Sequence, residues 1–282
     1  MSKVAIVTDS SPYIPQDYLE RYQIHVVPLN VIWDDETFAD GVDILPEAFY
    51  QRLSESDTMP STSQPSAAMF KESFEALHQS GYDILAILIS DKLSGTIASA
   101  LQAKEELPGV KIEIVDSEST AMATGFQVLA AAKAAQNSHS LDQCTEIALK
   151  AREHSGVIFV LDTLEFLHRG GRIGGAKRFV GTLLNVKPIL AIEDGEVISI
   201  DQVRTHTRAL EKIVDILEER TKGATSIRIA SLHANAEETA SAILQKAKDR
   251  LSPQETVFSE VSPVIGTHAG PGAVGLAYLT DM

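Results

Sequence analysis

Two hydroxyl side chains flank a glycine at the predicted start of a helix, in Ser94-Gly95-Thr96. This triplet follows the apolar run Ile84–Ile89, which has the composition of a strand that is buried on both faces. In open parallel sheets, ligands bind where strands end and helices begin. Free N–H groups and the helix dipole attract anions there. We therefore predict that this segment binds an anion rather than only capping the helix.

A second hydroxyl-rich segment is Pro60-Ser61-Thr62-Ser63-Gln64-Pro65-Ser66. Its prolines restrict the backbone, and Ser66 is a natural N-cap for a helix that we predict over Ser66–Ser80. Two interpretations stay open. The segment is either a capped loop or a set of hydroxyl and amide donors for a carboxylate or a phosphate.

Two glycine-rich segments carry cationic or titratable side chains. Phe166–Gly175 places Arg169 and Arg172 around a Gly-Gly pair, and it is either a solvated loop or a loop that recognises an anion or a partner. Gly266–Gly275 contains a literal G-x-G-x-x-G, but only seven residues follow it, which excludes the βαβ unit of a dinucleotide site. We predict a glycine-rich turn that presents His268.

The motifs of a self-sufficient enzyme are missing from the sequence. It has no P-loop, no G-x-S-x-G nucleophile elbow, and no His or carboxylate cluster at the spacing of metal ligands. We therefore predict no metal site and no cofactor. Anion-binding hydroxyls without an evident nucleophile–base pair favour a binding protein over an enzyme.

The composition bounds the class of protein. The chain has 282 residues, 44% of them hydrophobic, which is enough for one large domain or two ordinary ones. A formal charge of −15 disfavours general binding to nucleic acid or anionic membrane, because both are polyanions. A single cysteine, Cys144, excludes an internal disulfide framework. With no signal-peptide pattern and no apolar run of membrane-spanning length, we expect a cytoplasmic protein without stable membrane insertion.

Strand-like and helix-like segments alternate through the first half of the chain. This alternation predicts a Rossmann-like parallel sheet with helices on both faces. Helices are expected over Ser66–Ser80, Met122–Gln136 and Leu141–Glu153. The strands are expected at five short apolar runs: Val4–Val7, His25–Ile32, Ile84–Ile89, Lys111–Val115 and Val157–Leu161.

The second half predicts a mixed α/β sheet with helices mainly on one face. Asp194-Gly195 joins the β-rich runs Pro188–Ile192 and Val197–Asp201 into a hairpin. We place the domain boundary at residue 158, within about eight residues, which gives domains 1–158 and 159–282. The remaining elements are expected at Arg204–Lys222 (helix), Ser226–Leu232 (strand), Ala236–Leu251 (helix) and Thr256–Val261 (strand).

Five short motifs occur in the order seen in DegV family proteins, and the chain resembles that family over essentially its whole length. The resemblance implies two α/β domains with one fatty acid held in a buried tunnel between them. It also implies, for some members, a role as the fatty-acid-binding subunit of a bacterial fatty acid kinase, whose separate kinase subunit phosphorylates the carboxylate. The motifs are Thr8-Asp9-Ser10-Ser11, Ser61-Thr62-Ser63-Gln64-Pro65-Ser66, Leu93-Ser94-Gly95-Thr96, Asp162–Leu167 continuing into Arg169-Gly170-Gly171-Arg172-Ile173, and Gly266–Gly272.

The same resemblance assigns roles by position. Thr62 and Ser94 are expected to hydrogen-bond the carboxylate, with Gly95 and Thr96 nearby and His268 completing the polar end. The residues expected near the site or at a partner-docking surface are Ser63, Arg169, Arg172 and Thr267.

Our leading hypothesis is a carrier that binds a long-chain fatty acid and presents it to an ATP-dependent kinase subunit. One alternative is a stand-alone enzyme that acts on a small carboxylate or phosphate with His268 as the base. Another is a regulatory interaction module in which the lipid is structural.

The negative charge of the chain is unevenly distributed. The window Phe166–Ile192 has no Asp or Glu and carries a formal charge of +5, which leaves −20 for the rest. These cations either balance acidic residues elsewhere or form a basic docking face for an acidic kinase domain or its nucleotide phosphates. They are Arg169, Arg172, Lys177, Arg178 and Lys187.

Overall fold

A parallel sheet of four strands organises the first part of the chain. The computed structural model describes residues 3–179 and 186–282, and the sheet has the strand order β2-β1-β6-β7. Strands β1 and β6 are buried over nearly their whole length, as expected for strands covered on both faces. The parallel sheet predicted from the sequence is therefore confirmed, but the strand predicted for it at Val157–Leu161 is wrong in its placement, because that strand pairs within the second, mixed sheet. Its strands are β1 (Lys3–Asp9), β2 (His25–Val27), β6 (Tyr82–Leu88) and β7 (Ile112–Asp116).

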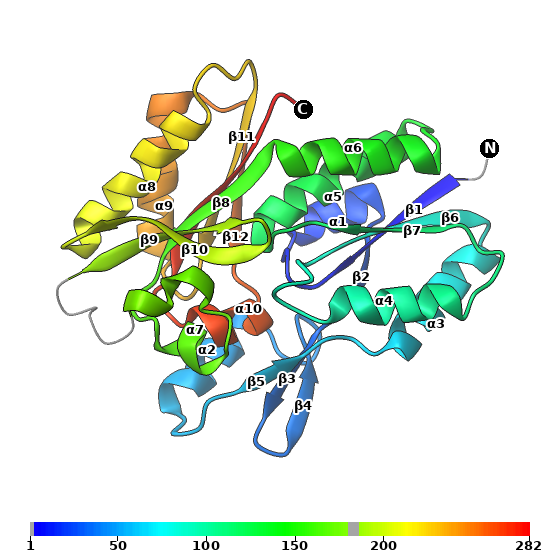
Figure 1. Ribbon diagram of the computed structural model, residues 1–282, viewed down its shortest axis with the longest axis horizontal. Coiled ribbons are helices and arrows are strands. Elements are labelled where there is room, and N and C mark those ends of the chain that lie inside the picture. Colours follow the sequence, from blue (N-terminus) through cyan, green and yellow to red (C-terminus); the bar gives the residue numbers. More distant parts are fainter. Residues whose placement is uncertain (1–2, 180–185) are drawn as a thin grey trace.

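Helices cover both faces of this sheet (Figure 1). One face packs against α3 (Ala67–Gln79) and α4 (Thr96–Glu105). The other packs against α1 (Gln16–Tyr22), α5 (Ala121–Gln136) and α6 (Leu141–Glu153). As predicted, the Ser66 hydroxyl caps α3, where it accepts a hydrogen bond from the Met69 N–H at 3.3 Å.

A mixed sheet of six strands organises the second part, in the order β10-β9-β8-β13-β11-β12. The β11–β12 pair is parallel and the other neighbours are antiparallel. Helices α8 (His206–Arg220) and α9 (Glu237–Leu251) pack together against one face, which confirms the predicted mixed sheet. The strands are β8 (Ser155–Val160), β9 (Lys187–Glu193), β10 (Glu196–Val203), β11 (Ile227–His233), β12 (Glu255–Glu260) and β13 (Val274–Thr280).

Helix α5 joins the two sheets. It contacts β1 and β6 of the parallel sheet and also β8, β11 and β13 of the mixed sheet. Twelve of its 16 residues are buried. Alanine supplies much of this buried surface, and its small side chain lets both sheets approach the helix closely. A helix that is apolar all round is the pattern of a fully buried element.

A small antiparallel sheet, in the order β4-β3-β5, was not predicted. The single strand expected over His25–Ile32 is wrong, because the chain leaves the parallel sheet after β2 and enters this second sheet at β3. Pro28 lies at the break and has no N–H to continue a ladder. The new strands and the helix that follows them are β3 (Asn30–Trp33), β4 (Glu36–Ala39), β5 (Ser61–Ser63) and α2 (Pro46–Glu55).

The predicted glycine-rich turn over Gly266–Gly275 is also wrong. Helix α10 spans Pro263–Ala269, with Ser262 as its N-cap and Pro263 in its first turn. Position 266 in this helix requires glycine, because a Cβ there would collide with the Tyr50 hydroxyl of α2. Only residues 270–273 form the turn before β13, so His268 is presented by a helix.

Two observations bear on the domain and membrane predictions. Helix α6 ends at Glu153 and β8 of the mixed sheet starts at Ser155, while the division at residue 158 stays a prediction. Within the two described ranges, no helix has both the length and the hydropathy needed to cross a bilayer. Residues 180–185 of the basic window lie outside the described residues.

Candidate functional site

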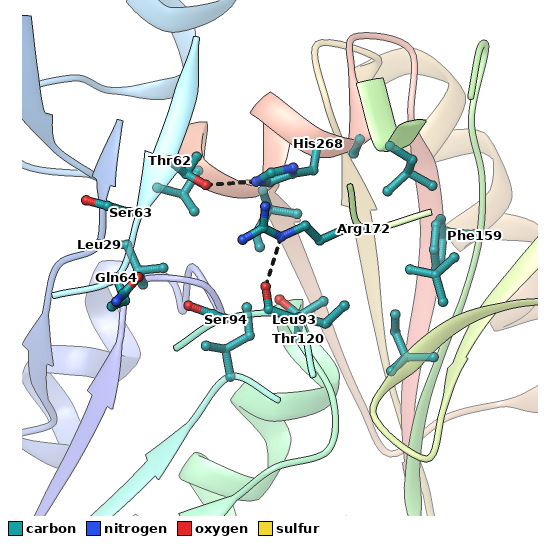
Figure 2. Close-up of a pocket in the computed structure, with 17 residues that line it drawn as sticks. Leu29, Thr62, Ser63, Gln64, Leu93, Ser94, Thr120, Phe159, Arg172 and His268 are labelled. Atoms are coloured by element: carbon teal, nitrogen blue, oxygen red, sulfur yellow. Dashed lines mark hydrogen bonds between the residues drawn. The ribbon is translucent and has the colours of Figure 1, made fainter. Parts of the chain in front are cut away.

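Polar side chains from both parts of the molecule meet at one end of an apolar pocket between the two sheets (Figure 2). The pocket encloses about 660 Å³ that no protein atom occupies, including its open mouth. Its walls come from β8, β9 and β10 on one side, from the loop after β6 on another, and from α7 (Glu165–Arg169) and α10. The apolar lining is Leu29, Ile89, Leu93, Phe159, Leu167, Ile192, Val197, Val264, Ile265 and Ala269.

Thr62 and His268 form a hydrogen bond across this polar end. Thr62 Oγ1, on β5, lies 2.8 Å from His268 Nε2, on α10 (Figure 2). The backbone pairing of β5 with β3 places Thr62 opposite Val31, which is fully buried. On its other side the imidazole lies against Gly170, where an added Cβ would collide with Nδ1. Glycine is thus required for the close approach of this loop to His268.

His268 is a neutral imidazole at physiological pH. Burial lowers its pKa to about 4, with a smaller contribution from the positive charge of Arg172. Its Nδ1 is buried and has no hydrogen-bond partner in the described part of the chain. A buried N–H without a partner is more costly than an unused lone pair, so we assign the proton to Nε2. In that tautomer Nε2–H donates to Thr62 Oγ1, which leaves the Thr62 hydroxyl proton for another acceptor.

Ser94 lines the pocket, and the other two residues of the predicted triplet lie at the start of α4 beside it. Ser94 Oγ and Thr96 Oγ1 are 2.8 Å apart, and Thr96 is fully buried at the start of α4. Gly95 is the N-cap residue of α4, and a Cβ there would lie 3.1 Å from the amide nitrogen of Gln64. Of the three residues, only Ser94 lines the pocket.

The two arginines of the glycine-rich segment have different positions. Arg172 lines the pocket and donates from Nε to the Leu93 carbonyl at 3.1 Å and from Nη1 to the Gly170 carbonyl at 2.6 Å. These bonds tie the segment to the loop that carries Ser94. Arg169 is 60% exposed and pairs with Glu165 at 2.6 Å, so it is a surface residue outside the pocket lining.

The remaining predicted residues also differ in position. Ser63 lines the pocket, and its Oγ accepts a hydrogen bond from Asn30 Nδ2 at 3.2 Å. Thr267 is buried, and its hydroxyl donates to the Pro263 carbonyl inside α10, so it does not face the pocket. The structure therefore brings together Thr62, Ser63, Ser94, Arg172 and His268 from the predicted set.

Sequence reasoning left one polar residue as an open alternative, and it missed another polar residue and the apolar wall. Gln64 lines the pocket, and its amide was among the possible donors of the hydroxyl-rich segment. Thr120 precedes α5, lines the pocket, and has a buried Oγ1 with no hydrogen-bond partner among the described residues. A threonine between a strand end and an alanine-rich helix could have indicated it. The apolar residues come from segments far apart in the sequence, which no local pattern connects.

Comparison with known proteins places the chain in a family. A family model with the description "Uncharacterised protein, DegV family" matches residues 3–281. The chain belongs to the DegV family. A DegV domain-containing protein of Clostridium perfringens is 39% identical over 282 residues, which cover 99% of each chain. The family resemblance inferred from the short motifs is therefore confirmed.

Solved structures share both the fold and the domain arrangement. A DegV family protein of Thermus thermophilus, described by its fatty acid binding, superposes with a TM-score of 0.94 at 34% identity, covering 99% of this chain and 100% of the other. DegV of Bacillus subtilis, described as a fatty acid binding protein, gives a TM-score of 0.91 at 32% identity, with all of both chains covered. Both of these solved relatives are described by their binding of fatty acids.

The polar end holds hydroxyls, an amide, an imidazole and one guanidinium. Across residues 3–179 and 186–282, no group of three or more His, Cys, Asp or Glu side chains is placed to hold a metal ion. This combination of neutral donors and one cation suits a carboxylate or another singly charged oxyanion.

The lowered pKa of His268 predicts that its ring is not protonated near neutral pH. Between about pH 5 and 8 the ring signals of His268, assigned by their loss in His268→Gln, are expected to show no shift as large as the one that protonation of an imidazole produces. Because the unfolded-state pKa is higher, the stability that this residue contributes should be present at pH 7 and be lost as the pH falls toward 4. A ring that titrates near pH 6.5 would contradict this protonation state.

Proposed function

We propose that this protein binds one long-chain fatty acid, with the acyl chain along the apolar wall and the carboxylate at the polar end. The observation that carries this proposal is the convergence of Thr62, Ser94, Arg172 and His268 at one end of an otherwise apolar pocket. The fatty acid binding of solved relatives that cover the whole chain supports it.

The energetics favour such a ligand over a small carboxylate. An acyl chain with about 14 methylenes gains on the order of 11 kcal/mol on burial, at roughly 0.8 kcal/mol for each CH₂. Association costs of several kcal/mol still leave tight binding. The polar end therefore needs only to orient the carboxylate.

The hydroxyls are arranged to donate. With His268 Nε2–H donating to Thr62, the Thr62 proton can bind a carboxylate oxygen. Thr96 can likewise donate to Ser94, which frees the Ser94 proton for the same group. Arg172 uses one N–H on each of two backbone carbonyls, so the other N–H groups of its fork can face the anion.

We further propose that the bound carboxylate is presented to a separate ATP-dependent kinase subunit. In that reaction a carboxylate oxygen attacks the γ-phosphorus of ATP, forming the acyl-phosphate and releasing ADP. Hydroxyl donors suit this role, because a bidentate arginine clamp would occupy both oxygens and compete with the attack. Arg172 already donates its Nε–H and one Nη1–H to backbone carbonyls. The nucleotide and Mg²⁺ would come from the partner, consistent with the missing P-loop.

The neutral state of His268 disfavours the alternative of a stand-alone enzyme with His268 as its base. A general base works best when its pKa lies near the working pH. A residue with a pKa of about 4 is a weak base at neutral pH, and its Nε2 is already engaged with Thr62. The regulatory module with a structural lipid differs from the carrier in predicting no change in partner binding when the lipid is removed.

Organic extraction of the folded protein tests the ligand directly. We expect mass spectrometry to find a fatty acid at about one per chain, because burial of a long acyl chain makes release slow. Protein that has been stripped of lipid should take up added palmitate to the same ratio. A reproducibly empty protein with no affinity for palmitate would exclude the proposed function.

Removal of the hydroxyls tests the polar end. Thr62→Ala and Ser94→Ala should each weaken palmitate binding by about tenfold or more, because a hydrogen bond to a charged group contributes roughly 1.5–3 kcal/mol. Ser61→Ala is the matched control, since Ser61 is exposed and precedes Thr62 on β5. Calorimetry on lipid-free protein measures the three affinities. Equal affinities for all variants would remove these hydroxyls from the site.

Charge reversal on the surface tests the partner-docking hypothesis. Arg172 lines the pocket and is unsuitable, so we choose Arg169 and Lys177, which are exposed. Arg169→Glu with Lys177→Glu should lower the rate of acyl-phosphate formation at least tenfold and leave palmitate affinity unchanged. Lys246→Glu with Lys248→Glu makes the same change in net charge on α9, far along the chain from this segment. If both pairs retain the wild-type rate, the basic segment is not the docking face.

A further inference from the structure

We propose that Asp40 is a positioning residue for the carboxylate site: it holds α10 near its N-terminal end and thereby fixes His268 beside Thr62. This inference rests on the proposed fatty-acid function. It concerns a residue that follows β4 in the small antiparallel sheet and does not line the pocket itself.

Asp40 joins three segments of the chain. Its Oδ1 accepts a hydrogen bond from the Val264 N–H of α10 at 3.1 Å, and its Oδ2 accepts one from Ser10 Oγ at 2.5 Å. Ser10 Oγ in turn accepts from the Leu29 N–H at 3.1 Å, and the Asp40 N–H donates to the Leu29 carbonyl at 2.9 Å. The Asp40 side chain is buried, with 1% of its surface exposed, and each of its two carboxylate oxygens accepts a hydrogen bond.

The hydrogen bond from Val264 to Asp40 affects the position of His268 because both residues belong to the short helix α10. Val264 and His268 are four residues apart, so they lie on one face of α10, about 6 Å apart along its axis, and both line the pocket. Helix α10 has seven residues, and Gly266 at its centre packs against the ring of Tyr50. A shift of its first turn therefore moves His268 as well.

The small antiparallel sheet contacts α10 at two points. Asp40 follows β4 and bonds the first turn of α10, while Thr62 on β5 bonds His268 near its end. Both strands pair with β3, which fixes their separation. The pairing with β3 fixes the positions of Asp40 and Thr62, and helix α10 fixes the positions of Val264 and His268. The two hydrogen bonds therefore have a fixed separation. Loss of the Asp40 contact removes the hydrogen bond at the first turn of α10 and leaves the one between Thr62 and His268.

Ionisation of the buried Asp40 carboxyl is energetically unfavourable. Burial raises the pKa of Asp40 to about 7, the Ser10 and Val264 hydrogen bonds oppose the rise, and the charge of Asp9 adds to it. No cationic side chain in the described part of the chain offsets its charge. An asparagine could make neutral hydrogen bonds without this penalty. The ionised form has a stronger hold on α10, because it accepts charge-assisted bonds at the positive end of the helix.

A pH dependence follows from this charge. The folded pKa of Asp40 lies above the unfolded value, so the stability contributed by the protonated carboxyl is lost as the pH rises through about 7. Over the same range the carboxyl becomes ionised, and its hydrogen bond with the Val264 N–H of α10 becomes stronger. His268 stays neutral over this range. Affinity for a fatty acid should therefore increase from about pH 6 to 8. The other titratable or charged groups around Asp40, α10 and the elements packed on it are Asp9, Tyr13, Glu47, Tyr50, Glu165, His168, Arg169, Arg172, His233 and Glu260.

A double-mutant cycle tests the inference with palmitate as the probe. At about pH 8, Asp40→Ala should weaken palmitate binding about tenfold in the wild-type background and less than about twofold in the His268→Ala background. Asp43→Ala is the matched control, because Asp43 lies in the same loop and, among the described residues, its side chain accepts a hydrogen bond only from the Ala39 N–H. A loss of equal size in both backgrounds, or no loss in either, would overturn the positioning role.

Asp40→Asn keeps the test decisive if the alanine variant does not fold. This variant keeps the shape and an acceptor but loses the charge, so its palmitate affinity should stay flat from about pH 6 to 8 while that of the wild type rises. Parallel profiles for the two proteins would contradict the inference. The His268 ring signals of lipid-free protein should also shift in Asp40→Asn and not in Asp43→Ala. This readout needs no fatty acid, so it separates failure of the positioning role from failure of the proposed function.

Discussion

The packing of α5 between two sheets is the constraint on which the rest of the structure depends. A helix that contacts the parallel sheet on one side and the mixed sheet on the other must present small side chains on both, and α5 does so with alanine. The spacing of the two sheets follows from this close contact. It brings the loop after β6, which carries Ser94, next to β8 and α10 of the second part. Thr120, directly before α5, then lies in the pocket.

Several patterns in the sequence were sufficient to predict the architecture. Alternating apolar runs and amphipathic helices gave the parallel sheet, Asp194-Gly195 gave the β9–β10 hairpin, and α6 spans the predicted Leu141–Glu153. The elements that were missed depend on tertiary contacts. Gly266 is a poor helix residue, yet α10 forms because that glycine packs on Tyr50. The three-stranded sheet was hidden because His25–Ile32 has the composition of one strand while Pro28 divides it.

The candidate site shows the same division. Hydroxyls at helix starts and in a proline-bounded segment were predictable, because few residue types at such positions can bind an anion. Which hydroxyl faces the pocket was not predictable. Thr96 bonds Ser94, and Thr267 bonds its own helix, since both are buried by the fold. Arg169 and Arg172 are three residues apart, yet of the two only Arg172 lines the pocket. Its guanidinium donates a hydrogen bond to the Leu93 carbonyl in the loop after β6.

The Thr62–His268 hydrogen bond gives the pocket a defined polar end at little energetic cost. A neutral hydrogen bond contributes about 0.5–1.5 kcal/mol, whereas burial of a long acyl chain contributes on the order of 11 kcal/mol. In the proposed function, burial of the hydrocarbon tail therefore offsets the rearrangement of this bond by the carboxylate. A charged imidazole would add a second cation beside Arg172, and an imidazolium–carboxylate pair would bind the anion strongly. Burial of His268 and the nearby Arg172 keep the ring neutral, so the ring adds no charge of its own to the binding of the proposed carboxylate.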